Sequence, residues 1–249
     1  MIPPRRVSKR VSVPDGQAII ALIPAAGLGA RFNPDQPKQH VELRGATVVE
    51  QSVKRVQACS RVVRTVVALA ADDPRLGEPG WAGVETLVGG STRAETVLNM
   101  LDALSGVSPL HWVMVHDAAR PCVRASDIDA LIDGVLAAGS DGGILATRVR
   151  DTVKRVGADR RITQTVPRDD LWCAATPQVF RLGALREAMH AARRAEIAVT
   201  DEASAMEFAG HDIIVVEGRD DNLKITRPDD LALALSILER QEQARTGET

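Results

Sequence analysis

Strand-length apolar runs alternate with stretches of helical period along this chain. The apolar runs occupy residues 18–24, 62–70, 111–117, 142–148 and 212–218. Nearly continuous apolar runs of this kind are typical of strands in a parallel sheet that is covered on both faces. The alternation predicts an α/β fold with a doubly wound, mostly parallel sheet, and with ligands bound at the carboxyl ends of its strands.

Between these runs, an apolar repeat of helical period predicts helices at residues 92–104, 126–138 and 227–241. Thr92 and Glu95 have the spacing of a capping box at the start of the first helix. The second helix is expected to begin at Ser126. Pro228 stands in the first turn of the last helix, where proline is tolerated.

Residues 149–168 do not fit this alternation. They have the pattern of two strands around a turn at residues 157–159, but they carry too many polar side chains to be buried in the main sheet. We therefore expect a protruding β-hairpin arm on a single domain of residues 18–249, preceded by a flexible extension of residues 1–17. Such an arm is suited to packing on a partner subunit.

The composition excludes several classes of protein. A net charge of −2 argues against a nucleic-acid binder, and no apolar run approaches the roughly 18 residues of a membrane helix. The N-terminus has no secretory pattern, so we expect a cytoplasmic protein. Cys59, Cys122 and Cys173 are far apart and form no ligand-spaced cluster with histidine, so we expect buried thiols rather than a metal site or disulfides.

The stretch "PAAGLGARFNPDQPKQH" (24–40) follows the first apolar run. Small residues after a strand let backbone N–H groups approach a phosphate chain. Phe32 occupies the position of the third glycine of the dinucleotide fingerprint, and the Gly-Lys-Ser/Thr of a P-loop is missing. A different phosphate loop is expected, with Arg31 and Lys38 as charge clamps, although either side chain alone could simply be solvated.

Three further stretches follow strands or precede helices where a second part of this site would lie. Residues 88–96 carry glycines and hydroxyls before a helix and could contact a base or phosphate, or only cap the helix. Asp117 ends a strand and could bind a metal or ribose, or cap the next turn. His116 beside it is expected to be structural. Lys224 lies in a charged loop that could equally be only solvated.

These stretches, in this order, resemble the 2-C-methyl-D-erythritol 4-phosphate cytidylyltransferases of the non-mevalonate isoprenoid pathway. The resemblance runs from about Ala18 to about Leu238, and Ser91 departs from it where the family often has an acidic residue. It implies a nucleotide-diphospho-sugar transferase-like fold. The motifs that carry it are "PAAGLGARF", "PKQH", "VHDAARP", "VRDTVKR", "TVPRDDLW", "TPQVF", "TDEASAMEFAG" and "VEGRDDNLKITRPDDLALA".

The resemblance implies that the enzyme transfers a cytidylyl group from CTP to 2-C-methyl-D-erythritol 4-phosphate and releases pyrophosphate. Arg31 and Lys38 match the family's transition-state cations, and Arg168 and Lys224 match the residues that hold the incoming phosphate. Thr152 and Thr200 match further substrate contacts. The backbone cradle for the triphosphate corresponds to Ala25, Ala26, Gly27 and Gly29, and the cytosine and ribose contacts correspond to Gly90, Ser91, Thr96, Asp117 and Ala118.

The resemblance also implies Mg²⁺ bridging the CTP phosphates, held by the nucleotide and water rather than by protein ligands. It implies a homodimer in which the arm of each subunit completes the substrate site of the other. Three alternatives stay open: a cytidylyltransferase for another polyol phosphate such as ribitol 5-phosphate, an NAD-dependent dehydrogenase, and a non-catalytic nucleotide-sensing protein.

Overall fold

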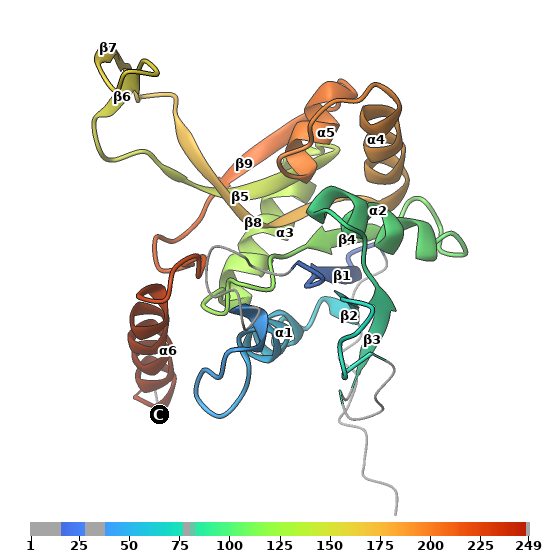
Figure 1. The fold of residues 1–249 in the computed structure, drawn as a ribbon. Helices are drawn as coiled ribbons and strands as arrows, with labels where there is room; N and C mark the ends of the chain where they lie inside the picture. The colour runs from blue at the N-terminus through green and yellow to red at the C-terminus, as the bar shows by residue number, and fades with distance from the viewer. Residues whose placement is uncertain (1–15, 28–37, 77–80, 82, 248–249) are drawn as a thin grey trace, which may run out of the picture.

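The computed structural model describes residues 16–27, 38–76, 81 and 83–247, and its centre is a seven-stranded sheet (Figure 1). The strand order is β3-β2-β1-β4-β8-β5-β9. Only β8 is antiparallel to its neighbours β4 and β5, and the other neighbouring pairs are parallel. The sheet contains β1 (Ile19–Pro24), β2 (Val62–Leu69), β3 (Val84–Val88), β4 (Trp112–Val115), β5 (Gly142–Arg148), β8 (Trp172–Arg181) and β9 (Ile213–Glu217).

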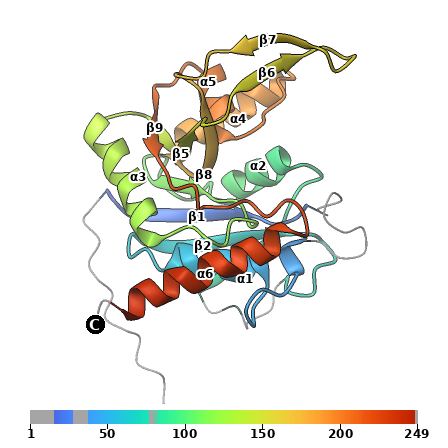
Figure 2. The same cartoon turned by 90° about the vertical axis from the view of Figure 1, so that its left-hand side faces the viewer.

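Helices cover both faces of this sheet, so the prediction of a doubly wound, mostly parallel α/β fold is confirmed. One apolar layer packs under α2 (Arg93–Ala103), α4 (Leu182–Arg194) and α5 (Glu202–Phe208). The other packs under α1 (Val48–Gln57) and α3 (Ala125–Ala138). The last helix, α6 (Asp230–Thr246), lies outside α1 (Figure 2), and a short 3₁₀ helix, η1 (Lys38–His40), precedes α1.

The side-chain period of the central strand β1 explains why both faces are covered. Ile20 and Leu22 point into the layer of α2, whereas Ile19, Ala21 and Ile23 point into the layer of α1 and α3. All five are buried. Alternate residues of a strand face opposite sides of the sheet, so an apolar run without polar interruption requires a hydrophobic cover on each side.

The five strands expected from the apolar runs are all present, as β1, β2, β4, β5 and β9. Strands β3 and β8 were not expected. The outer half of β8 is exposed and Pro177 lies in its middle, and proline inside a run argues against a central strand. The helix starts also differ slightly: α3 begins at Ala125, and α6 begins at Asp230, so Pro228 precedes the helix rather than lying in its first turn.

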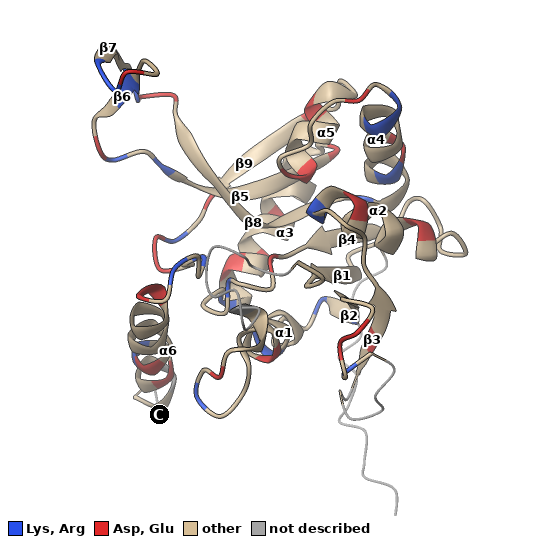
Figure 3. Ribbon diagram, viewed as in Figure 1, with Lys and Arg blue, Asp and Glu red and all other residues tan. Residues whose placement is uncertain are grey.

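The expected hairpin arm is present and projects away from the sheet (Figures 1 and 2). Its strands, β6 (Val153–Val156) and β7 (Ile162–Val166), pair antiparallel, and the N–H of Gly157 donates to the carbonyl of Arg161 across the turn. The arm and its stem carry several lysine and arginine residues (Figure 3). Val156 and Ile162 on the arm are 55% and 65% exposed, so the hairpin presents apolar groups to its surroundings.

The expectation that all three cysteines are buried is confirmed for two of them and wrong for the third. Cys59 and Cys122 are buried as expected, but Cys173 is exposed, because it lies on the outer half of β8, which runs toward the arm and pairs with β5 but no longer with β4. None of the described helices has the length and apolar character needed to cross a membrane.

Replacing Phe180, a fully buried side chain of β8, should lower the free energy of unfolding. The Phe180→Ala variant should lose about 3–5 kcal/mol, because it removes a large apolar group and leaves a cavity. Phe208→Ala is the matched control, since Phe208 is 46% exposed and should cost about 1 kcal/mol or less. Denaturant unfolding of both variants measures this, and equal losses would contradict the assigned core.

Candidate functional site

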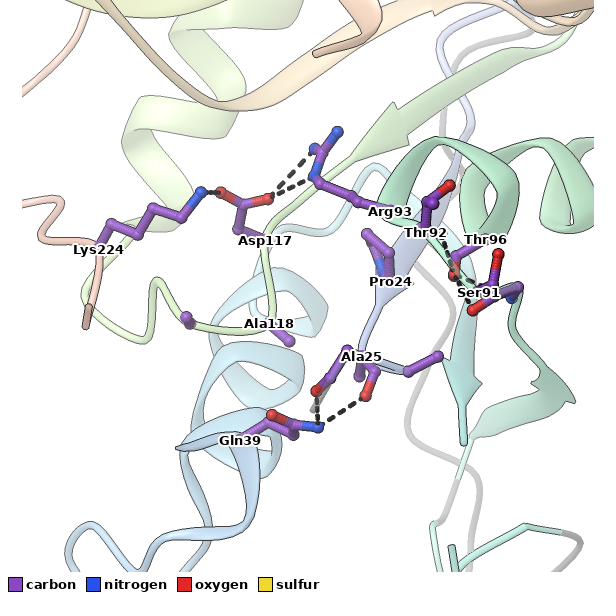
Figure 4. Close-up of a pocket in the computed structure, with 14 residues that line it drawn as sticks. Pro24, Ala25, Gln39, Ser91, Thr92, Arg93, Thr96, Asp117, Ala118 and Lys224 are labelled. Carbon is purple, nitrogen blue, oxygen red and sulfur yellow. Dashed lines mark hydrogen bonds and ion pairs between the residues drawn. The ribbon is translucent and has the colours of Figure 1, made fainter. Parts of the chain in front are cut away.

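A cavity of about 260 Å³ lies at the carboxyl ends of β1, β3 and β4 (Figure 4). The loops that follow these strands form its walls, and the segments around Gln39 and Lys224 close it. This is the edge at which ligands are expected in an open parallel sheet. The lining residues are Pro24, Ala25, Ala26, Gly27, Gln39, Gly90, Ser91, Thr92, Arg93, Thr96, Asp117, Ala118, Ala119 and Lys224.

One wall is the turn after β1, and a buried glutamine holds its backbone. The Gln39 side-chain amide donates to the carbonyl of Ala25 at 3.0 Å and to that of Gly27 at 2.7 Å (Figure 4). Gln39 belongs to η1, the same short helix that begins with Lys38. The glutamine therefore fixes the position of η1 relative to the small-residue turn.

The opposite wall is the loop between β3 and α2, which depends on two glycines. A Cβ on Gly89 would lie 2.3 Å from the Cβ of Ala26, and a Cβ on Gly90 would lie 2.4 Å from the Cγ of Glu95. The missing side chain of Gly89 lets the loop approach the β1 turn this closely, and the missing side chain of Gly90 leaves room for Glu95 of α2. The N–H of Gly90 donates to the Thr96 hydroxyl at 3.0 Å, which fixes the loop on the first turn of α2.

The predicted capping box at Thr92 and Glu95 forms only in part. The Thr92 hydroxyl accepts from the N–H of Glu95 at 3.1 Å, as expected for an N-cap. The Glu95 carboxylate, however, accepts from the N–H and the hydroxyl of Ser91, at 2.8 and 2.5 Å. These bonds lower the pKa of Glu95 and keep a negative charge beside Ser91 at the rim of the cavity.

Asp117 is the buried carboxylate of the site, and three cations surround it. Its Oδ2 lies 2.8 Å from the Nζ of Lys224, and its Oδ1 lies 3.2 Å from the Arg93 guanidinium (Figure 4). The Nε of Arg120 lies 3.6 Å from Oδ2. Burial alone would raise the pKa of Asp117, but Arg93 and Lys224 outweigh burial and hold the pKa well below its ordinary value. Asp117 is therefore ionised at neutral pH.

Arg93 connects Asp117 to a second buried carboxylate. Its guanidinium donates two bonds to Glu202, at 2.7 and 3.0 Å, in addition to its contact with Asp117. Burial opposes the charge of Arg93, but Glu202 and Asp117 outweigh burial and raise its pKa. This arginine joins the start of α2 to the start of α5.

His116 is fully buried and is held in one tautomer. The Thr176 hydroxyl accepts from the N–H of Asp117 at 2.9 Å, so its own hydrogen is available for the Nδ1 of His116 at 3.2 Å. Nε2 then carries the proton and donates to the carbonyl of Arg120 at 3.0 Å. Burial lowers the pKa of His116 to about 4. The imidazole is therefore neutral, and both of its nitrogens make hydrogen bonds that hold the chain after β4.

A second cavity, of about 270 Å³, adjoins the first and shares Arg93, Asp117 and Lys224 with it. Thr200 and Asp201, from the segment before α5, lie on its far side. The chain of charges therefore separates two compartments that open on the same three side chains. The other lining residues are Arg120, Ala174, Ala175, Thr176 and Gln178.

Ten of the residues proposed from the sequence line these two cavities. The first cavity holds Ala25, Ala26, Gly27, Gly90, Ser91, Thr96, Asp117, Ala118 and Lys224, and the second holds Thr200.

The other five predicted site residues are Gly29, Arg31, Lys38, Thr152 and Arg168. Gly29 and Arg31 lie outside the described residues, and Lys38 is described only as the first residue of η1, without its side chain. Thr152 and Arg168 flank the strands of the arm and line neither cavity; the Arg168 guanidinium donates to the carbonyl of Arg150.

Sequence reasoning missed Gln39, Arg93, Arg120 and Glu202 as members of the site. Each belongs to a stretch that the sequence analysis assigned to the site or to the family motifs. Nothing in those stretches indicates which side chains face one another. Gln39 binds the backbone of Gly27, which lies 12 residues away in the sequence. Arg93 binds Glu202, which lies 109 residues away. Only the fold brings these segments together.

The fold and the two adjoining cavities define a nucleotidyltransferase-like protein. The chain matches the family model of IspD, 2-C-methyl-D-erythritol 4-phosphate cytidylyltransferase, over residues 19–240. A Vibrio atlanticus protein of that name is 45% identical over 91% of this chain and 98% of its own length. A Pseudomonas entomophila protein of that name is 46% identical over 86% of this chain and 93% of its own.

Solved structures agree with these sequence matches. The crystal structure of the Francisella tularensis 2-C-methyl-D-erythritol 4-phosphate cytidylyltransferase has a TM-score of 0.78 and 36% identity, over 88% of this chain and 99% of that one. The chain belongs to the 2-C-methyl-D-erythritol 4-phosphate cytidylyltransferase family, and it is a CTP-dependent nucleotidyltransferase.

Burial of His116 should make the protein less stable in mild acid. Its pKa of about 4 in the folded protein lies below the ordinary 6.5, so only the unfolded chain takes up this proton between those values. The stabilisation is complete above pH 6.5 and is lost as the pH falls toward 4, by about 2 kcal/mol between pH 7 and pH 5.

Denaturant unfolding at pH 7 and pH 5 measures this loss in the wild type, in His116→Asn and in the exposed-histidine control His111→Asn. The loss should be smaller in His116→Asn and unchanged in the control. An equal loss in all three proteins would contradict a neutral, buried His116.

Proposed function

We propose that this chain transfers the cytidylyl group of CTP to 2-C-methyl-D-erythritol 4-phosphate, with release of pyrophosphate, in the non-mevalonate isoprenoid pathway. The observation that carries the proposal is the pair of cavities that share Arg93, Asp117 and Lys224. A reaction between two anionic substrates needs two compartments that meet at cations. The chain's membership of the cytidylyltransferase family supports the same assignment.

CTP is proposed to occupy the first cavity. The backbone of residues 25–27 would face the triphosphate, and Gly90, Thr96, Asp117 and Ala118 would contact cytosine and ribose. Ser91 stands where the family often has an acidic residue, and it holds the carboxylate of Glu95. We propose that Glu95 supplies the negative charge that Ser91 lacks.

The acceptor is proposed to occupy the second cavity, with its phosphate between Lys224 and Arg168. Lys224 and Thr200 lie at this cavity, whereas Thr152 and Arg168 lie on the arm and line neither cavity of their own chain. We therefore propose a homodimer in which the arm crosses to the partner subunit. The projection of the arm and the exposed apolar side chains of Val156 and Ile162 support this assembly.

In the proposed reaction, an oxygen of the acceptor phosphate attacks the α-phosphorus of CTP. A new P–O bond forms, and the bond from the α-phosphorus to the bridging oxygen breaks, so that pyrophosphate leaves with the electron pair. A phosphate monoester is already anionic near neutral pH, so no general base is needed. Positioning and stabilisation of charge carry the reaction, and Arg31, Lys38 and Lys224 are the proposed cations.

Mg²⁺ is proposed as the metal of the reaction, bound by the nucleotide rather than by a protein cage. Among the described residues, no group of three or more histidine, cysteine or carboxylate side chains could hold a metal ion. Both oxygens of Asp117 already contact cations. This donor set fits an ion held by phosphate oxygens and water. When bound, Mg²⁺ would neutralise part of the triphosphate charge.

The relatives described above are all named for 2-C-methyl-D-erythritol 4-phosphate as the acceptor, so ribitol 5-phosphate is not favoured as an acceptor. The same names do not favour the dehydrogenase or the nucleotide-sensing protein. We also propose a cytoplasmic location, where CTP and sugar phosphates are available.

Lys38→Ala should lower kcat by about 10²–10³-fold, the usual loss when one transition-state donor is removed. The KM for CTP should change less. Pyrophosphate release measures both constants, and Lys54→Ala, on α1, is the control that should keep normal turnover. A fall in kcat of less than tenfold in a folded protein would show that Lys38 is not a transition-state cation.

Arg168→Ala and Lys224→Ala homodimers should each be nearly inactive, with acceptor use damaged more than CTP binding. Mixing the two variants under conditions that exchange subunits should restore activity. In a mixed dimer with a crossing arm, one site receives both defects and the other receives neither, so up to about half of the normal activity per mixed dimer returns.

If both residues act within one chain, every site keeps one defect and mixing restores nothing. Subunit exchange is confirmed separately with a tagged and an untagged copy. Absence of recovery after confirmed exchange would reject the shared site but leave the cytidylyltransferase assignment standing.

A further inference from the structure

Glu202 is a charged side chain that touches neither cavity. It is the first residue of α5 and is fully buried. Burial raises the pKa of its carboxyl group, and the two-pronged contact with Arg93 favours the ionised form. Removing an ionised carboxylate from water costs several kcal/mol, and well-packed apolar residues often stabilise a protein at least as well as a buried ion pair. A purely structural requirement at this position would therefore be met by an apolar side chain. We therefore looked for a neighbouring side chain whose position depends on the charge of Glu202.

That partner is Arg93, which is divided between two carboxylates. Glu202 accepts two bonds from the terminal nitrogens of the guanidinium, at 2.7 and 3.0 Å, and Asp117 contacts Nε and Nη2 at 3.2 Å. The fork-shaped contact with Glu202 fixes the plane of the guanidinium. Asp117 consequently meets Arg93 through one oxygen, Oδ1, and its other oxygen, Oδ2, faces Lys224 at 2.8 Å and the more distant Nε of Arg120 at 3.6 Å.

The result is a line of alternating charges, Glu202–Arg93–Asp117–Lys224, contributed by four separate segments of the chain. Its last three members are the wall that the two cavities share (Figure 4). Glu202 is also joined to the acceptor side through the chain, because Thr200 and Asp201 directly precede it and line the second cavity.

The segment before Glu202 is itself firmly held. The Gln178 side chain donates to Asp201 at 2.9 Å and accepts from the N–H of Ala203 at 3.0 Å. A rigid start of α5 gives Glu202 a fixed place from which to orient Arg93.

We infer that Glu202 is a positioning residue for the acceptor: through Arg93 and Asp117 it sets where the ammonium group of Lys224 lies. Without its charge, the Arg93 guanidinium is free to turn fully onto Asp117 and occupy both carboxylate oxygens. Lys224 then loses its partner and its fixed position at the acceptor cavity. This inference rests on the proposed function, in which Lys224 binds the acceptor phosphate.

The test is a double-mutant cycle on the full-length enzyme, with pyrophosphate release measured against each substrate. Glu202→Gln keeps the shape of the side chain and removes its charge. In the wild-type background it should lower kcat/KM for 2-C-methyl-D-erythritol 4-phosphate by about 10–100-fold and change the KM for CTP by less than about threefold. In a Lys224→Ala background, the same change should cost less than about threefold, because the group that it positions is already gone.

Two further variants separate positioning from stability. Met206→Ala removes a fully buried apolar side chain from the same helix, and it should lower the melting temperature while leaving the KM for the acceptor normal. Arg93→Lys keeps the charge but cannot form the two-pronged contact, and it should reproduce the acceptor defect of Glu202→Gln. Arg93→Lys also serves as the test if Glu202→Gln does not fold.

The outcomes are distinct. Equal losses from Glu202→Gln in both backgrounds, or equal losses for CTP and acceptor, would overturn the inference and leave Glu202 as a structural ion pair. So would an Arg93→Lys variant with normal acceptor kinetics. A wild-type enzyme that releases no pyrophosphate from CTP and this acceptor would instead reject the proposed function, and the inference with it.

Discussion

The ionised carboxylate of Asp117, held among three cations, is the interaction on which the site depends. Arg93 comes from α2, Arg120 from the turn after β4 and Lys224 from the loop before α6, and Asp117 contacts all three. Without it, three positive charges would face one another in a partly buried space and repel. The N–H of Asp117 donates to Thr176 on β8, so the carboxylate is tied to the middle of the sheet.

This arrangement shows how a protein can build a cationic site before its anionic substrates arrive. Arg93, Arg120 and Lys224 are held by their contacts with Asp117 and Glu202. The carboxylates hold these cations in fixed positions, from which the cations can contact phosphate groups. Substrate oxygens can then replace water around groups that already have their geometry, which lowers the cost of ordering them during the reaction.

Strand β8 connects this site to the arm. Its inner half is buried between β4 and β5 and carries Thr176 and Gln178, which hold Asp117 and the start of α5. Its outer half is exposed and continues from the hairpin that projects from the sheet (Figure 1). A single antiparallel strand thus joins the rigid part of the proposed acceptor cavity to the base of the arm, so in the proposed homodimer β8 would connect one site to the arm that completes the other.

The α/β class, five of the seven sheet strands, the hairpin arm and most residues that line the first cavity can be predicted from the sequence. These features depend on local patterns: apolar runs, small residues after a strand and a polar hairpin. The place of the antiparallel β8, the exposure of Cys173 and the contacts of Gln39, Arg93 and Glu202 follow from the fold and could not be predicted. A side chain's partner depends on which distant segments the sheet order brings together, and an ion pair such as Arg93–Glu202, 109 positions apart, leaves no local pattern in the sequence.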